Sequence, residues 1–449
     1  MTTTTSAAGT VNPKPKRGRG RPQPKLQSIL NRDALLKALD AADITVSKSH
    51  LDGFYQALHR EHYPELSDFV ERYYKNDLDA KQLNAKKNGN SNGGQGSSNT
   101  PAEAAAAANP QDDRPAHRIP LKNPVSTRKN KNRVSLPKKL LDFLKDPNNG
   151  FVTVSSKVAK VKTSADQSTT KLAVQLHDGQ LVESVLMRYG PKTDRTTGQL
   201  RKAGRASLCV SSQVGCAMGC NFCATGMMGL TGSLHYAEIL EQVVHAERIL
   251  AHEALERMAQ TQEELEKGTS QRKINRKKQG LASDLEVVRN IVFMGMGEPL
   301  DNYTNVVTAC RALVDRKRWN LAHWRVTVST VGIASKIRQL TRDLPEICLA
   351  LSLHAPNQAL RSEIVPTAKH YPIEDMIDAL DGHMRTVDKS RVNDGKPHHQ
   401  ADRTALLAHS TKRRAMIEYV MCKLPSARLT AHVCGNSGMA FERLLWTKY

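Results

Sequence analysis

The amino-acid sequence predicts an α/β protein with a parallel core, preceded by a small helical domain and a few β-strands. The parallel core is predicted because short apolar runs alternate with helical stretches between about residue 290 and residue 421. The helical domain is predicted because apolar residues recur at three- and four-residue spacing from Ser28 to Tyr74. The β-strands are predicted because β-branched runs alternate with Gly and Asp turns from Val152 to Met187.

These patterns divide the chain into six segments. They are a basic disordered tail over 1–27, a small helical domain over 28–80, a low-complexity linker over 81–132, a β-rich segment over 133–190, the core over 191–421 and a divergent tail over 422–449. The core strands are expected to begin near Cys209, Ile291, Arg325, Cys348 and Met416. The clearest core helix is expected to begin at about Tyr236, where apolar residues follow one face.

The chain is strongly basic. It has 66 Lys and Arg against 44 Asp and Glu in 449 residues, a formal net charge of +22. This balance agrees with an RNA partner but cannot identify one. The segment Arg19-Gly20-Arg21-Pro22 lies in the basic tail, which we interpret as a solvated arm that attracts polyanions. A hook for the DNA minor groove and an organellar or nuclear address are the alternatives.

The sequence has no feature that predicts a membrane protein. It contains no apolar run near the roughly 18 residues that a membrane-spanning helix needs, and no short apolar stretch follows the basic N-terminus. We expect a soluble, cytoplasmic monomer with no membrane partner. A plastid or a mitochondrion is the alternative compartment, since the basic N-terminus without acidic residues also fits a transit segment.

Cysteines are concentrated in one short segment. Cys216, Cys220 and Cys223 form a Cys-x3-Cys-x2-Cys pattern, and Cys209 precedes them. Three thiolates on one loop can hold three irons of a 4Fe-4S cluster and leave the fourth iron free for an outside ligand. Structural zinc is the alternative, because Cys209 is near enough to be a fourth ligand, and unligated cysteines are a further one.

This cysteine spacing, with Phe222 directly before the third cysteine, resembles the signature of radical S-adenosylmethionine (SAM) enzymes. Further blocks in the same order resemble the RlmN/Cfr family of RNA adenosine methyltransferases, and the RlmN branch most closely. The blocks are Arg205 to Cys216, Phe293-Met294-Gly295-Met296-Gly297-Glu298-Pro299-Leu300, Val326 to Thr330, Leu349 to Asn357 and Ile417 to Met421. The resemblance covers about residues 150–421 and, more loosely, the helical N-terminal domain.

The resemblance implies a fold, an activity and cofactors. The fold is a partial, incomplete radical SAM parallel barrel, with residues 191–421 as the radical SAM core. The activity is methylation of carbon 2 of adenosine in large-subunit ribosomal RNA, and possibly in tRNA next to the anticodon. The cofactors are a 4Fe-4S cluster and SAM, two molecules per turnover. The partners are ribosomal RNA, tRNA and an electron donor such as flavodoxin or ferredoxin.

The resemblance also implies roles for individual residues. The metal ligands are Cys216, Cys220 and Cys223; Gly297 and Glu298 hold the SAM amino group; and Ser329, Ser352, Leu353 and His354 line the rest of the pocket. Glu183 matches the general base, and Cys209 matches the cysteine that resolves an enzyme–RNA adduct by thiol–disulfide exchange. Without the resemblance, Glu183 is interpreted as an exposed strand residue and Cys209 as a small buried one.

The C-terminal segment departs from the family pattern. The family has a second essential cysteine well downstream of the Ile417 to Met421 block, whereas only 28 residues follow Met421 here. Cys434 lies too close to that block to be the same position, so we expect a chain truncated relative to the family. Two other functions therefore stay open: methylation of carbon 8 of adenosine, as in Cfr, and an inactive RNA-binding remnant that lacks the methyl-carrier cysteine.

Overall fold

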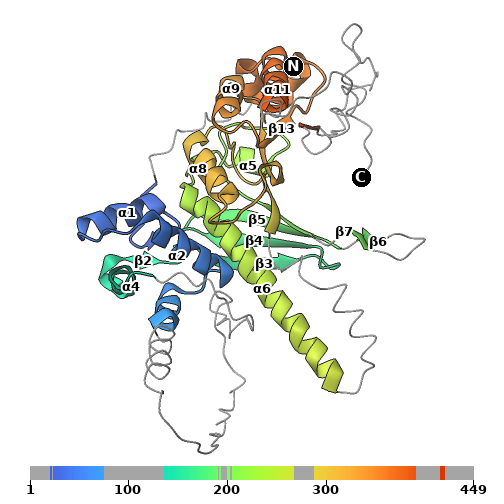
Figure 1. Ribbon diagram of the computed structural model, residues 1–449. Coiled ribbons are helices and arrows are strands. Elements are labelled where there is room, and N and C mark those ends of the chain that lie inside the picture. The colour runs from blue at the N-terminus through green and yellow to red at the C-terminus, as the bar shows by residue number, and fades with distance from the viewer. Residues whose placement is uncertain are drawn as a thin grey trace, which may run out of the picture.

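Figure 1 shows the protein as a computed structural model. The structure describes residues 21–22, 24–74, 136–190, 192–193, 200–202, 205–266, 288–390 and 415–419. The predicted linker over 81–132 and the predicted tail over 422–449, with Cys422 and Cys434, lie outside these residues.

The centre of the molecule is an eight-stranded mixed sheet. Its strands are β3 (Lys157–Thr163), β4 (Thr169–Gln175), β5 (Leu181–Tyr189), β8 (Arg205–Cys209), β11 (Val288–Phe293), β12 (Val326–Thr330), β13 (Cys348–Ser352) and β14 (Met416–Glu418). They lie in the order β14-β13-β12-β11-β8-β5-β4-β3. The pairs from β14 to β8 are parallel, and the pairs from β8 to β3 are antiparallel. The predicted α/β class, with N-terminal helices and a mostly parallel sheet, is confirmed.

Three strand starts follow the apolar runs closely, whereas β11 begins at Val288, before the predicted Ile291. The strands β12, β13 and β14 begin at or next to the predicted Arg325, Cys348 and Met416. The prediction of a strand beginning near Cys209 is wrong, because β8 ends there. Residues 205–209 are already paired with β5, and after Cys209 the chain leaves the sheet. Most residues of this block are small or polar, so no apolar run marks where the strand begins.

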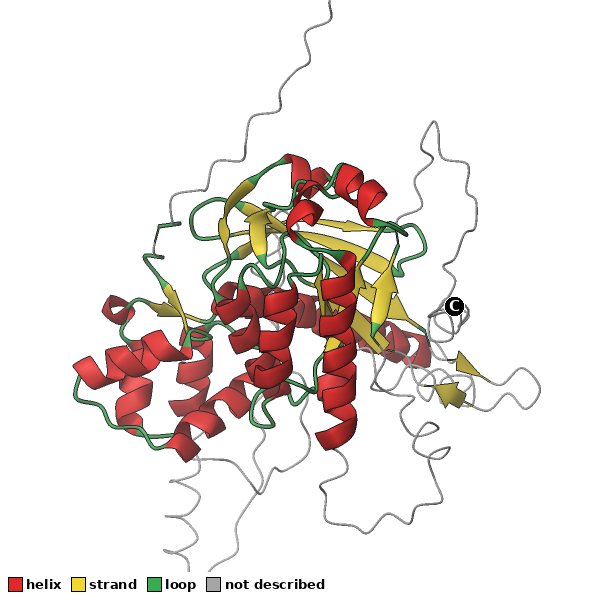
Figure 2. Cartoon of the chain, turned by 90° about the horizontal axis from the view of Figure 1, so that it is seen from above, coloured by secondary structure: helices red, strands yellow, loops and turns green. Residues whose placement is uncertain are grey.

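Helices cover the sheet and join its parallel strands. They are α5 (Ala224–Met227), α6 (Tyr236–Glu266), α8 (Tyr303–Val314), α9 (Ala334–Asp343), α10 (Gln358–Ile364) and α11 (Ile373–Ser390), with the 3-10 turns η2 (His323–Arg325) and η3 (Pro366–His370). The predicted start of a helix at Tyr236 is confirmed. In Figure 1, α6 crosses the antiparallel part of the sheet, where Ser184 donates to Gln242 at 2.7 Å. Figure 2 shows most helices on one side of the strands.

A helical layer precedes the sheet. It comprises α1 (Arg32–Ala41), α2 (Lys48–Arg60), a helix over 66–74, α4 (Lys138–Lys145), the turn η1 (Pro147–Asn149) and the short parallel pair β1 (Gln27–Ser28) and β2 (Phe151–Val152). Asn31 and Ser47 cap α1 and α2, since their side chains accept backbone N–H groups of the first turns. The buried faces of these helices, including Leu35 and Phe54, share one apolar core with α6 and the sheet.

Two short hairpins lie beside the sheet. The pair β6 (Lys192–Thr193) and β7 (Leu200–Lys202) is antiparallel, as is the pair β9 (Gln213–Gly215) and β10 (Leu230–Ser233). The second hairpin frames the cysteine segment, because β9 ends just before Cys216 and β10 begins after Cys223. The cysteine segment is therefore held at both ends.

Arg21, in the segment predicted as a basic tail, is buried against this hairpin. Its guanidinium donates to Asp178 at 2.6 Å and to both carboxylate oxygens of Glu238 at 2.7 and 2.8 Å. Burial is the largest single effect on the pKa of Arg21 and lowers it, but the two carboxylates together raise the pKa above its usual value. Binding of Arg21 in a DNA minor groove would have to break both ion pairs.

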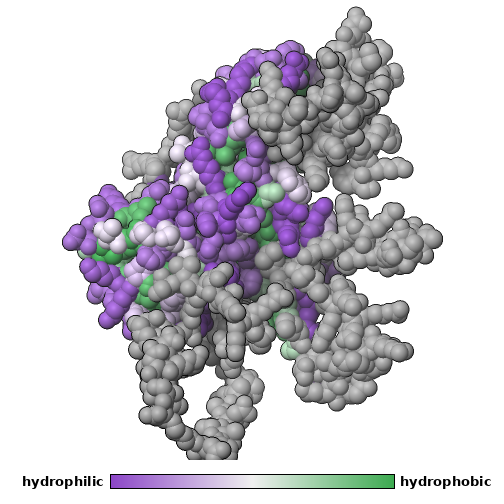
Figure 3. Space-filling model, viewed as in Figure 1, coloured by the Kyte–Doolittle hydropathy of each residue, from purple (hydrophilic) through white to green (hydrophobic). Residues whose placement is uncertain are grey.

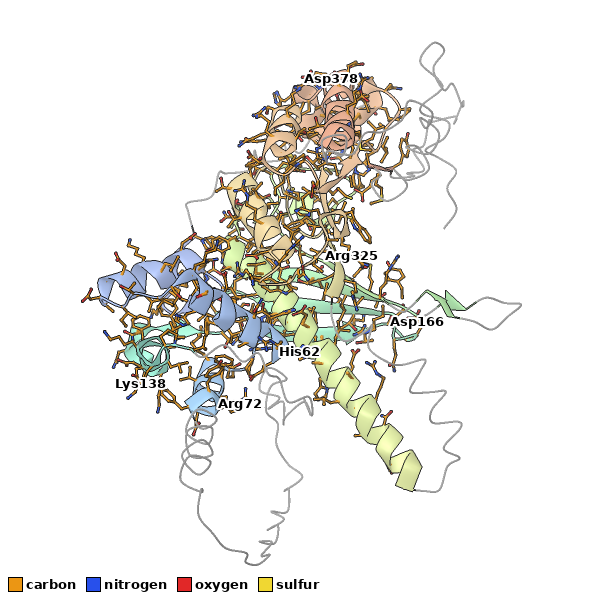
Figure 4. The ribbon with its side chains drawn as sticks, viewed as in Figure 1. His62, Arg72, Lys138, Asp166, Arg325 and Asp378 are labelled. Carbon is orange, nitrogen blue, oxygen red and sulfur yellow. The ribbon has the colours of Figure 1, made fainter. Side chains whose placement is uncertain are left out.

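The surface visible in Figure 3 is mostly hydrophilic over the described residues, with apolar side chains showing between the helices. Figure 4 shows Arg325 at the start of β12 and Asp378 on α11, beyond the other end of that strand. None of the described helices is long and apolar enough to span a bilayer.

Glu247 on α6 is a buried carboxyl at the contact with the N-terminal helices. Only 1% of its surface is exposed, and His59 Nδ1 of α2 lies 3.8 Å from its carboxylate. Burial raises the pKa of Glu247 to about 8, against the opposing effect of Trp319. Burial also lowers the pKa of His59 to about 4. Both groups are therefore neutral near pH 7.

We predict that stability falls with rising pH through Glu247. Because its pKa is raised in the folded state, that state keeps a proton which the unfolded state releases, so stability declines as pH rises from 4.5 toward 8. Between pH 6 and pH 9 the wild type should lose about 2–3 kcal/mol relative to Glu247→Gln, as measured by urea unfolding. A stability difference between the two proteins that does not change with pH would contradict this.

Candidate functional site

The three clustered cysteines lie on one loop at the carboxyl end of β8. The loop turns back on itself, since the Cys216 N–H donates to Gly229 at 2.9 Å and the Cys223 N–H donates to Cys220 at 3.0 Å. Gly215 has a φ of 76°, and a Cβ there would lie 1.8 Å from the Gly229 carbonyl oxygen. Only glycine allows this approach of the two arms.

The three thiols influence one another electrostatically. Burial raises the pKa of Cys216 to about 12, and Glu298, Cys220 and Cys223 raise it further while a backbone N–H opposes. Burial likewise raises the pKa of Cys220 to about 11, with Cys223 and Glu298 adding to it. These groups therefore lie close enough to repel one another when they ionise.

The donor set of the loop consists of three thiols. Within the described ranges, no group of three or more His, Cys, Asp or Glu side chains is arranged to hold one ion. A 4Fe-4S cluster does not need such a group, because each thiolate binds a different iron. Three thiols on one loop, within electrostatic reach of one another, fit three corners of that cluster.

The turn after β11 brings Gly297 and Glu298 to the cysteine loop. Gly297 has a φ of 99°, and a Cβ there would lie 2.5 Å from the Cβ of Gln213 on β9. The Glu298 N–H donates to Gln213 Oε1 at 2.9 Å, and Gln213 Nε2 donates to Asp301 at 2.9 Å. The buried Gln213 side chain therefore ties the cysteine arm to this turn.

Glu298 is a buried carboxyl that the fold surrounds with donors. Its side chain accepts the N–H groups of Leu300 at 3.0 Å and Val331 at 2.9 Å. Burial still raises the pKa of Glu298 to about 7. A carboxylate has about four acceptor positions, so Glu298 can accept further hydrogen bonds, and a cation beside it would favour the charged form.

Hydroxyl and carboxyl groups meet where β12, β13 and β14 end. Ser329 and Ser352 both donate to Glu418 Oε2 at 2.9 Å, and their hydroxyls lie 3.2 Å apart. The backbone N–H groups of Leu353 and His354 donate to the carbonyl of Glu418 at 3.1 and 3.2 Å. Parallel strands place these side chains at one edge of the sheet.

His354 has an unusual backbone and an unused nitrogen. Its φ is 61°, in the left-handed region that few residues other than glycine adopt, although histidine does so more often than most. Its Nδ1 is buried and has no hydrogen-bond partner among the described residues. The ring meets Phe222 edge to face, with centroids 4.8 Å apart. A buried polar atom without a partner next to the cysteine loop indicates a place for a ligand.

Cys209 and Glu183 lie on the same face of the sheet. Cys209 is opposite Val185 of β5, and Glu183 is two residues from Val185. Burial raises the pKa of Cys209 to about 11, so the thiol is protonated at neutral pH. The Glu183 side chain is about half exposed, and Lys171 Nζ lies 2.8 Å from its carboxylate.

The structure thus brings most predicted positions to one edge of the sheet. The cysteine loop, Glu298, the two serines and His354 converge there, whereas Glu183 stands apart in an exposed ion pair. Gln213 and Glu418 also belong to this edge, although they were not predicted from the sequence. The signal for Glu418 is present, since it is the one charged residue in the apolar run from Met416 to Met421.

Comparison with known proteins finds relatives along about half of the chain. No family model matches. Over 242 residues the chain is 37% identical to "Ribosomal RNA large subunit methyltransferase N" of Nitrosopumilus maritimus, with 54% of this chain and 58% of the relative covered. Over 226 residues it is 41% identical to "Probable dual-specificity RNA methyltransferase RlmN 2" of Opitutus terrae, with 50% and 49% covered.

A third relative and one solved structure complete the comparison. The chain is 38% identical over 277 residues to "Probable dual-specificity RNA methyltransferase RlmN" of Cutibacterium acnes, with 59% of this chain and 58% of the relative covered. A crystal structure of a radical SAM methyltransferase from Sphaerobacter thermophilus matches with a TM-score of 0.42 and 28% identity, covering 63% of this chain and 82% of that one. The chain spans about half the length of the curated relatives that it matches.

We predict that Gly297→Ala destabilises the protein, because the new Cβ would meet Gln213 in a backbone conformation that alanine rarely adopts. The expected cost is about 1–3 kcal/mol in thermal or urea unfolding. Gly382→Ala is the matched control, since this glycine lies in α11 with nothing within 4 Å of an added Cβ. The control should gain up to about 1 kcal/mol. Equal stability of the Gly297→Ala variant and the wild type would contradict the turn described here.

Proposed function

This chain belongs to the RlmN family of radical SAM RNA methyltransferases, and from that membership we propose that it methylates carbon 2 of adenosine in large-subunit ribosomal RNA. Adenosine next to the tRNA anticodon is the second proposed target. The observation that carries the proposal is the cysteine loop at the carboxyl edge of the sheet. Glu298 lies close enough to this loop to raise the pKa of the Cys216 and Cys220 thiols.

Cys216, Cys220 and Cys223 would hold the 4Fe-4S cluster. When bound, the cluster supplies the single electron that cleaves SAM reductively. The chain's part is to keep three thiols at one place and to limit the access of water. The supporting features are the burial of Cys220 and the turn at Gly215.

Glu298 and the backbone of Gly297 would hold the amino group of SAM. A cation beside Glu298 removes the unfavourable burial of a lone negative charge, which the raised pKa of this carboxyl reflects. The rest of the pocket would be formed by Ser329, Ser352, Leu353 and His354. We add Glu418 to this set, because its carboxylate fixes both serine hydroxyls.

Cys209 and Glu183 would act on the RNA side of the reaction. A buried thiol with a pKa of about 11 is a poor nucleophile at neutral pH. Cys209 would therefore need a base to remove its proton when it attacks the sulfur with which it forms a disulfide. Glu183, on the same sheet face, would take the proton from adenine after its carboxylate separates from Lys171. The second cysteine that the family uses falls on no described residue.

The sheet and the charge agree with this function. The parallel strands from β8 to β14 support a partial, incomplete barrel of the radical SAM type. The net charge of +22 supports a ribosomal RNA or tRNA partner, whose phosphates attract basic proteins. A low-potential electron donor such as flavodoxin or ferredoxin would complete the set of partners.

We predict that iron binding depends on the loop cysteines. After anaerobic reconstitution with iron and sulfide, the full chain should bind about four irons and turn brown, as a 4Fe-4S cluster requires. Cys220→Ala should lose most of this iron. Cys310→Ala should keep it, because Cys310 is a buried cysteine of α8 outside the loop. A colourless wild type that binds one zinc ion would overturn the cluster assignment.

We predict that the reconstituted full chain forms 2-methyladenosine. It would be incubated with SAM, a one-electron reductant and unmodified ribosomal RNA or tRNA, and the nucleosides would be separated by mass spectrometry. The appearance of 8-methyladenosine would instead assign the Cfr-type reaction. An intact cluster with RNA binding but no methylated nucleoside would favour the RNA-binding remnant.

A further inference from the structure

Arg361 is a buried cation close to the cysteine loop. It lies on α10, between the end of β13 and η3, and none of its surface is exposed. A guanidinium stays charged at every physiological pH, so its burial is costly unless an anion or several acceptors surround it. The groups around Arg361 must therefore offset the cost of burying its charge.

Arg361 meets backbone carbonyls rather than a carboxylate. It donates to Leu353 at 3.0 Å, to Tyr371 at 3.4 Å and to Ser352 at 3.5 Å, and it also donates to the carbonyl of Val331. These carbonyls belong to the last residue of β13 and to the segments that follow β12, β13 and η3. In the part of the chain that the structure describes, no ion pair joins Arg361 to Asp or Glu. Its positive charge is therefore not balanced by a protein carboxylate.

The cysteine loop rests on the segment that carries Arg361. Asn221 donates from its backbone to Ile364 at 2.9 Å and from its side chain to Glu363 at 2.6 Å. Thr367 donates to the carbonyl of Met218 at 3.4 Å. Cys220 also packs into a small apolar cluster with Val365, Ala368 and their neighbours. The loop and the arginine thus share one support.

Arg361 lies beside the thiols. Its chain neighbour Leu360 packs in the same apolar cluster as the three loop cysteines, and so does Val331, whose carbonyl accepts a hydrogen bond from Arg361. Three thiolates on one loop carry three negative charges, and a buried cation at this place attracts them in a medium where water screens little.

We infer that Arg361 is the positioning residue of the cysteine loop and its internal counter-cation. Its fixed positive charge favours the reduced form of the cluster. The inference rests on the proposed function, because it requires the cluster. Reduction adds one electron from an external one-electron donor and hence one negative charge, with no bond made or broken. A nearby fixed cation stabilises the more negative form, so Arg361 raises the reduction potential.

The two features of the side chain predict separable effects. The charge acts on the potential, whereas the planar fork with several donors holds the three carbonyl-bearing segments in place. Lysine keeps the charge but cannot bind four carbonyls in this arrangement. Methionine, of similar length, removes both.

The test uses the full chain after anaerobic reconstitution, as wild type, Arg361→Met and Arg361→Lys. Arg338→Met and Arg338→Lys are the matched controls, since Arg338 lies on α9 in exposed ion pairs with Asp375 and Asp378. Midpoint potentials are measured by EPR during titration with dithionite, and iron loss to a chelator is timed separately. Neither readout needs RNA or methyl transfer.

Arg361→Met should disfavour the reduced cluster about tenfold, which is a potential lower by about 59 mV for one electron. Arg361→Lys should change that equilibrium by less than about threefold but should lose iron several times faster than the wild type, since the charge stays and the fork is gone. The Arg338 variants should match the wild type in both readouts.

A wild-type potential in Arg361→Met would overturn the inference. If Arg361→Met does not fold, a wild-type rate of iron loss in Arg361→Lys overturns it on its own. A wild-type chain that takes up no iron would instead contradict the proposed function, so the two failures are distinguishable.

Discussion

The repulsion among acidic groups at the carboxyl edge of the sheet is the constraint on which the site depends. Burial and mutual repulsion raise the pKa of Cys216 to about 12, that of Cys220 to about 11 and that of Glu298 to about 7. Left alone, the two thiols stay protonated at neutral pH. Cationic ligands relieve the repulsion, so metal binding here would release protons and strengthen as pH rises. The fold must hold the groups together before the ligands arrive.

Several parts of the chain provide that support. Gln213 joins the cysteine arm to the turn at Glu298, and Asn221 joins the loop to the last turn of α10. The hairpin that frames the loop is in turn bound by Arg21, whose guanidinium reaches Ser233 and Glu238. The end of the predicted basic tail therefore contributes to the surroundings of the site, which its composition alone does not indicate. The helical layer shares its apolar core with α6, whose first turn carries Glu238.

The sequence predicts those features that leave a local pattern. Apolar runs mark the beginnings of β12, β13 and β14, and the cysteine spacing marks the loop. The end of β8 at Cys209 leaves no such pattern, because its small and polar residues are paired within the sheet. Gln213 and Arg361 could not be predicted, since their partners are backbone groups or distant side chains that only the fold brings near. A buried cation with carbonyl partners looks the same in sequence as a surface arginine.

The central claim is that three thiols hold a cluster with one iron open to SAM. The most direct measurement is the EPR spectrum of the dithionite-reduced, oxygen-protected full chain, recorded with and without SAM. The account predicts the signal of a one-electron-reduced 4Fe-4S cluster that changes when SAM is added, because SAM binds the open iron. A chain that gives no such signal, or one that SAM leaves unchanged, would contradict it.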